Sequence, residues 1–215
     1  MAAVKSKIVL PVIFIVVLAI SRIPGLLPLN FSVVYAFAFC AGVFFPSRLA
    51  WWLPLAVLLG TDIGLNFYYQ YHHVDGVWSA ENLANLAFNY IAYLALIFLG
   101  RRFRPSMSIM SLVGGGVLGA IIFYLITNTA SWLFNPFHNP EYTKNLTGWI
   151  IALTKGIGGY PSTWEFFRNT LLSGGIFTAI FAAAEKLAAE SPAEKNAGAT
   201  EPEEEAAPEP EEAKA

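Results

Sequence analysis

Carboxylate and amide side chains recur inside long apolar stretches of this 215-residue sequence. Asp62 stands within one such stretch, and Asn66 lies four residues later, on the same face of a helix. In the next apolar stretch Asn82, Asn85, Asn89 and Tyr93 form a polar stripe at helical spacing. Ionisable groups in apolar spans are costly and tend to be functional. These residues therefore predict a site that binds a small polar molecule or an ion.

Further polar residues stand near the ends of other apolar stretches. Arg22 and Arg168 would supply a cation for a carboxylate or a phosphate on a ligand, since arginine recognises both. The candidate substrate-binding residues are Asp62, Asn66, Asn85, Asn89, Asn128, Arg22, Arg168 and Asn169. All of them fall in the outward half of the topology derived below, which predicts a polar chamber open to the outside.

Structural explanations for the same residues remain open. Asparagines between packed membrane helices often serve only as interhelical hydrogen bonds. Asp62 would pair with Arg22 or Arg168, bind a ligand or an ion, or be hydrated near the interface. An interfacial ion pair is the simplest expectation for Glu165 and Arg168.

Motifs for catalysis or metal binding are missing from the sequence. It contains no HExxH, Walker A, GxSxG or paired CxxC pattern. The adjacent His72 and His73 do not share a helical face, and we interpret them as part of a surface loop. We expect no catalytic residues, no metal site and no cofactor, and treat a membrane enzyme using Asp62 or these histidines as a minor alternative.

The composition indicates the class of protein in which these side chains are placed. Hydrophobic residues make up 56% of the chain and charged residues 13%, against about 25% charged in soluble domains. Residues 1–184 hold ten Lys and Arg against five Asp and Glu, whereas residues 185–215 hold three Lys against ten Glu. This excludes a soluble globular domain, a disulfide scaffold and a nucleic-acid binder with a basic surface.

We therefore predict an all-α fold, a polytopic six-helix transmembrane bundle, as residues 1–187. Alternating hydrophobicity typical of a membrane β-barrel is absent. The expected spans are residues 8–20, 31–45, 49–69, 83–99, 107–134 and 166–187, and residues 147–160 would form an interfacial helix. A first span cleaved as a signal peptide is the alternative at the N-terminus.

The distribution of Lys and Arg predicts the orientation. With the N-terminus inside, the cluster Arg101, Arg102 and Arg104 lies in the cytoplasm, as the positive-inside rule requires. Both termini would then be cytoplasmic and residues 135–165 external. The Ala/Glu/Pro-rich residues 188–215 are predicted to be a disordered acidic tail.

Small residues four apart occur on three of the expected spans. Examples are Ala38 with Gly42 and Gly116 with Ala120. Such faces let helix backbones approach closely. We expect most of them to seal the bundle and the rest to meet a partner helix.

Several short motifs, in order and at suitable spacing, resemble an uncharacterised family of bacterial integral membrane proteins. They are Arg22-Ile-Pro24, Leu29-Asn30-Phe31-Ser32-Val33, Leu53-Pro54-Leu55, Thr61-Asp62, Thr127-Asn128 and Phe166-Phe167-Arg168-Asn169-Thr170. That family is similar in span number and motif placement to the substrate-binding S components of energy-coupling factor (ECF) transporters. The resemblance implies a bacterial plasma membrane protein that captures a small molecule outside and docks on a membrane coupling subunit with ATPases.

The sequence leaves other functions open. A membrane assembly or accessory protein without a ligand would use the glycine faces and the acidic tail. An ion-coupled carrier is a further alternative. The identity of a ligand does not follow from the residues, because amides and a carboxylate suit many small polar molecules.

Overall fold

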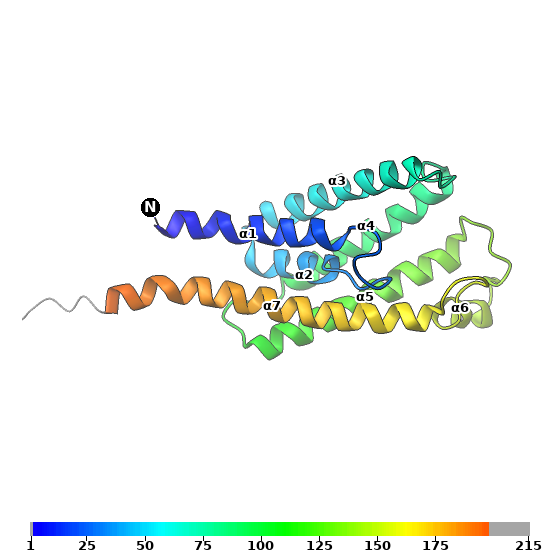
Figure 1. Ribbon diagram of the computed structural model, residues 1–215. Helices are drawn as coiled ribbons and strands as arrows, with labels where there is room; N and C mark the ends of the chain where they lie inside the picture. Colours follow the sequence, from blue (N-terminus) through cyan, green and yellow to red (C-terminus); the bar gives the residue numbers. More distant parts are fainter. Residues whose placement is uncertain (1, 198–215) are drawn as a thin grey trace, which may run out of the picture.

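The computed structural model describes residues 2–197, with side chains placed from Pro11 to Ala189. These residues form seven helices and no strand (Figure 1). The helices are α1 (Ala2–Ser21), α2 (Val34–Phe44), α3 (Leu49–Tyr71), α4 (Ala80–Gly100), α5 (Ile109–Phe134), α6 (Leu146–Leu153) and α7 (Thr163–Ala197). The all-helical fold is confirmed, whereas the predicted count of six helices is not.

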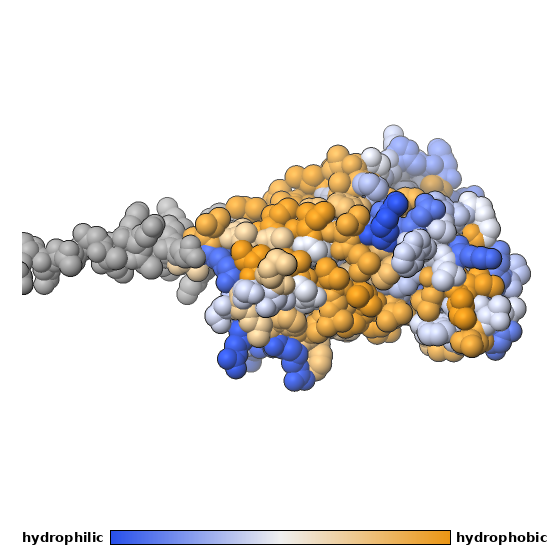
Figure 2. All heavy atoms as spheres, turned by 90° about the horizontal axis from the view of Figure 1, so that it is seen from below, coloured by the Kyte–Doolittle hydropathy of each residue, from blue (hydrophilic) through white to orange (hydrophobic). Residues whose placement is uncertain are grey.

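Four of the helices are long and apolar enough to cross a membrane: α3, α4, α5 and residues Thr163–Ala189 of α7. Residues Pro11–Ser21 of α1 and the helix α2 (Val34–Phe44) are shorter apolar helical segments. Figure 2 shows hydrophobic residues over the middle of the bundle and hydrophilic residues gathered at its two ends. The chain therefore has the form of a multi-pass membrane protein.

Helix α2 lies at the centre of the bundle and is too short to span it. Its 11 residues rise about 16 Å, roughly half of a 30 Å hydrocarbon core. Every residue from Val34 to Val43 is buried, and α2 contacts α1, α3, α4, α5 and α7. The helix predicted over residues 31–45 is therefore shorter than expected, and it begins only after residues 22–33 have turned back from the end of α1.

Small residues allow α2, α4, α5 and α7 to pack with their backbones in contact. A Cβ atom added at Gly42 would overlap the carbonyl oxygen of Ile97, and one at Gly100 would overlap that of Phe39. A Cβ at Gly116 would overlap Thr178 of α7. The expectation that these small faces seal the bundle is confirmed at these positions.

Helix α6 is shorter than the interfacial helix expected over residues 147–160, and it is attached to α5. The Asn145 side chain caps it by accepting a hydrogen bond from the Gly148 amide at 2.9 Å. Trp149 donates to Thr129 Oγ1 at 3.0 Å, and Tyr124 donates to the carbonyl of Leu153. Beyond α6 the Gly158 amide donates to Glu141, which holds the pKa of that carboxyl below its usual range.

The first and last described residues, Ala2 and Ala197, lie at the same end of the bundle (Figure 1). The α3–α4 connection and α6 lie at the opposite end. Helix α7 continues to Ala197 and so includes residues 188–197 of the predicted acidic tail. Alanine, glutamate and lysine, which dominate this segment, have high helix propensity. The rest of the predicted tail lies outside the described residues.

The contact between α2 and α4 predicts opposite effects of alanine at two helical glycines. Gly42→Ala should lower the free energy of unfolding by roughly 1–3 kcal/mol, because a backbone oxygen cannot move aside cheaply. Gly60→Ala in α3 is the matched control. No atom lies within 4 Å of the added carbon there, so alanine should stabilise the helix by about 0.5–1 kcal/mol. Denaturant unfolding of the purified variants measures both, and equal effects would contradict this packing.

Candidate functional site

An ion pair joins the end of α1 to the middle of α3. Arg22, the first residue after α1, donates through Nη2 to Oδ1 of Asp62. The Asp62 side chain is 5% exposed and that of Arg22 is 15% exposed. Tyr90 of α4 donates to the other carboxylate oxygen, Oδ2, at 2.8 Å. Both carboxylate oxygens of Asp62 are thus engaged within the protein.

A polar cavity of about 540 Å³ lies beside this ion pair. It occupies the part of the bundle that α2 does not fill, between the 22–33 turn and the far halves of α3, α4 and α5. Its polar lining residues are Ser21, Arg22, Asn30, Ser32, Tyr35, Asp62, Asn66, Tyr69, Asn82, Asn85, Asn89, Tyr93, Thr127 and Ser131. The cavity therefore exists because α2 is short and the turn before it is folded into the bundle.

Two amides of α4 keep hydrogen-bonding groups available to the cavity. Asn89 makes no hydrogen bond to any described residue, and Asn85 makes one, in which its Oδ1 accepts from Ser131 at 3.4 Å. The Nε of Arg22 also has no partner among the described residues, but it is fully buried and is not accessible from the cavity. Asn85 and Asn89 are half-buried and line the cavity, so their free groups are accessible to a molecule that enters it.

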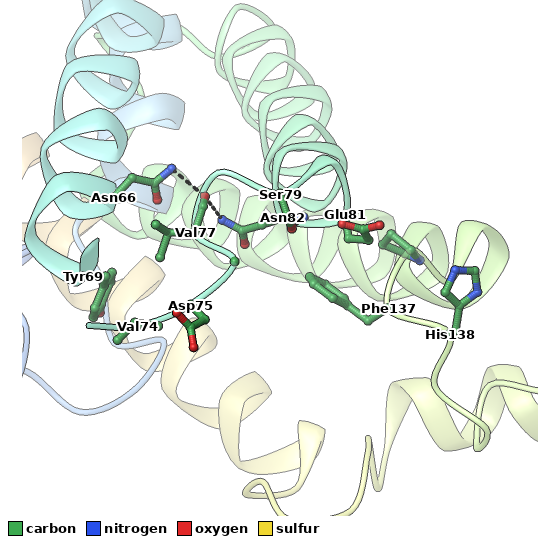
Figure 3. A pocket seen from close by; sticks show the side chains of 12 residues that line it. Asn66, Tyr69, Val74, Asp75, Val77, Ser79, Glu81, Asn82, Phe137 and His138 are labelled. Atoms are coloured by element: carbon green, nitrogen blue, oxygen red, sulfur yellow. Dashed lines mark hydrogen bonds between the residues drawn. The ribbon is translucent and has the colours of Figure 1, made fainter. Parts of the chain in front are cut away.

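Two other amides of the predicted stripe are used structurally. Asn66 and Asn82 both donate to the carbonyl of Val77 in the α3–α4 connection, at 3.2 and 2.7 Å. Figure 3 shows the two amide groups converging on this carbonyl. Asn66, Asn82 and Tyr69 line both the polar cavity and a second cavity of about 720 Å³ towards Phe137 and His138. These residues, with the Val77 carbonyl, therefore separate the two cavities, and we call them the Val77 partition.

Three of the predicted site residues lie away from the polar cavity. Asn128 donates to the carbonyl of Tyr124 one turn earlier in α5, at 2.9 Å. Asn169 donates to the carbonyl of Leu29 at 2.9 Å and so holds the 22–33 turn against α7. Arg168 is exposed on α7. The structure thus brings together Arg22, Asp62, Asn66, Asn85 and Asn89 of the predicted set.

The structure selects one of the two ion pairs considered for Asp62. Arg22 is its partner, and this is the one ion pair formed within the described part of the chain. The expected pair of Glu165 with Arg168 is wrong, because Glu165 accepts a hydrogen bond from Ser162 at 3.2 Å instead. The serine precedes α7 and captures the carboxylate in its first turn, as in other helix N-termini.

His72 and His73 are exposed, as expected for a surface loop. Among residues 2–197 no group of three or more His, Cys, Asp or Glu side chains is placed to hold a metal ion.

Sequence reasoning missed most of the aromatic part of the site. Tyr35 and Tyr93 pack against Phe123, with ring centroids 4.8 and 5.4 Å apart, and all three line the cavity. Tyr90, the second partner of Asp62, was also missed. Tyr93 lies one turn after Asn89, so the helical stripe was a signal for that residue. The other three depend on contacts between separate helices.

Comparison with known proteins assigns the family. Residues 2–196 match DUF6580, a family of unknown function. The chain belongs to the DUF6580 family. No curated protein and no solved structure matches it significantly. The expected membership of an uncharacterised family with apolar, membrane-type helices is confirmed, whereas the similarity to ECF S components remains a prediction.

The ion pair of this DUF6580 protein predicts a stability effect. Asp62→Asn leaves the Arg22 charge unpaired in a largely buried site, at a cost on the order of 3–5 kcal/mol. The free energy of unfolding should fall by that amount, as measured by denaturant titration in detergent.

The matched control is Asp75→Asn, at an exposed aspartate without an ion pair in the described structure. It should be close to neutral. The double variant Arg22→Met with Asp62→Leu should recover much of the lost free energy of unfolding, because it leaves no unpaired buried charge. An Asp62→Asn protein as stable as the wild type would contradict a buried pair.

The Val77 partition predicts a local effect on dynamics. Asn82→Ala removes the shorter of its two hydrogen bonds, worth about 1 kcal/mol. Amide hydrogen exchange in residues 72–79 should therefore accelerate roughly five- to tenfold, as measured by mass spectrometry. Asn85→Ala, one turn further along α4, should leave exchange in this segment unchanged, because Asn85 does not contact the connection.

Proposed function

We propose that this protein is a small-molecule-binding membrane subunit, similar to an S component of an ECF transporter, that captures its substrate from the outer side. The single observation that supports this most is the polar cavity beside Arg22 and Asp62 in an otherwise apolar bundle. The half-buried amides of Asn85 and Asn89 line this cavity with hydrogen-bonding groups that the described residues leave free. A bound polar molecule would use these groups.

The position of the cavity supports capture from the outside. The cavity lies in the half of the bundle away from Ala2 and Ala197, whereas the α4–α5 connection with its arginine cluster lies at the same end as these residues. The positive-inside rule assigns that arginine-rich end to the cytoplasm of a bacterial cell. In this orientation the cavity faces the exterior of the plasma membrane, with both termini inside.

In this proposal the chain binds and the energy comes from elsewhere. A membrane coupling subunit with ATPases would move the substrate, and the chain itself would catalyse no reaction and need no cofactor. The residues that would contact the substrate are Asn85 and Asn89. Arg22 and Asp62 would mainly set the polarity of the cavity, because they are already paired.

The proposal is tested by the small molecules that the protein retains. Wild-type protein, purified in native lipid nanodiscs, should carry a small molecule detectable by native mass spectrometry. Asn89→Leu should lower its occupancy at least tenfold, because a charge-neutral amide is lost without disturbing any hydrogen bond in the protein. The melting temperature without the molecule should stay near that of the wild type.

Asn128→Leu is the matched control, since Asn128 lies on α5 outside the cavity lining and bonds only within its own helix. It should retain the molecule. Wild-type protein that carries no small molecule but a stoichiometric protein partner would overturn the proposal. That outcome would favour an assembly or accessory protein instead.

A further inference from the structure

The charges that line the polar cavity cancel one another. Arg22 and Asp62 are the two charged residues among its lining residues, and they are paired with each other. A ligand with a net charge would meet no free counter-charge there, and a buried charge without a partner is strongly disfavoured. An anion that paired with Arg22 would leave the Asp62 carboxylate without a counter-charge. A zwitterion that paired with both residues would have to break the Arg22–Asp62 ion pair.

The hydrogen-bonding groups left free in the cavity are a mixture of donors and acceptors. Asn89 offers a carbonyl oxygen and two N–H groups, and Asn85 offers its N–H groups. Amides of this kind match molecules whose edge carries carbonyl and N–H groups side by side, because both partners then satisfy one another.

Three aromatic residues that pack on one another, Tyr35, Tyr93 and Phe123, are among the residues that line the cavity. The rings of Tyr93 and Phe123 are stacked, with an interplanar angle of 20°, and Tyr35 meets Phe123 edge-on at 4.8 Å. These three residues come from α4, α5 and α2, so their relative position is fixed by the core of the bundle. Aromatic faces favour planar π-systems in offset-stacked or edge-on contact.

We infer that the polar cavity takes an uncharged planar heterocycle with a lactam edge, that is, a ring carbonyl next to a ring N–H. The inference rests on the proposed function, which it deepens by naming the class of substrate. The ring would contact the aromatic side chains of Tyr35, Phe123 and Tyr93. Its lactam edge would bond to Asn89 and Asn85.

The molecule retained by nanodisc-purified wild-type protein gives the primary test. It should absorb in the near ultraviolet as an aromatic heterocycle does and should be neutral at pH 7 by its composition. A retained amino acid, carboxylate, phosphate ester or organic cation would overturn the inference while leaving the proposed function standing. Protein that retains no small molecule and binds none of the probes below would overturn both.

Matched probes test the exclusion of charge directly. Uracil and orotate share one ring and differ by a carboxylate, and lumichrome supplies a larger neutral lactam. If any of the three binds, as measured by calorimetry with the purified protein, we expect a neutral probe to bind at least tenfold more tightly than orotate. Orotate that binds as well as uracil or lumichrome would overturn the inference.

The variant Asn89→Asp distinguishes a neutral ligand from a cationic ligand. The change keeps the side-chain volume but adds a negative charge and removes the N–H donors. It should weaken retention of the neutral heterocycle at least tenfold, whereas tighter retention would show a cationic ligand and overturn the inference. Asn128→Asp, outside the cavity lining, is the control for a general effect of charge on the bundle.

Discussion

The structure depends on how one arginine is neutralised inside an apolar bundle. Arg22 follows α1 directly, where its charge is largely buried, and the cost of burying it is offset only by pairing with Asp62. Tyr90 completes the carboxylate's hydrogen bonds and adds α4 to the connection. This interaction ties three helices together at one point. It also fixes where the chain leaves α1 and turns back towards α2.

The turn that follows Arg22 divides the bundle into two different halves. On the side of Ala2 and Ala197, α2 fills the centre and its glycine contacts with α4 bring the backbones together. On the other side α2 is absent, so the far halves of α3, α4 and α5 surround a cavity in place of a helix. A dry, tightly packed half thus supports a polar, open one, because rigid packing keeps the cavity from collapsing.

The polar side chains of α3 and α4 differ in their hydrogen-bonding partners, depending on how far they lie from the helix ends at the α3–α4 connection. Asn66 and Asn82, near the helix ends, hold the Val77 carbonyl of the connection. Asn85 and Asn89 lie deeper and leave groups free towards the cavity. The same residue type along one helix face therefore first holds the α3–α4 connection and then lines the cavity with free hydrogen-bonding groups. Which role a residue has follows from whether a backbone carbonyl is within reach.

The sequence by itself determined the apolar helices, the close-packing glycines and the need of Asp62 for a partner, because hydrophobicity, helical spacing and charge burial are local properties. It did not determine that Arg22 and not Arg168 is that partner, since the two candidates lie far from Asp62 along the chain. It predicted a longer helix than the observed α2, and it did not identify Tyr35, Tyr90 and Phe123 as residues of the site. Only the tertiary structure decided which amides remain free, because a side chain is available for binding only if no atom from another element has already satisfied it.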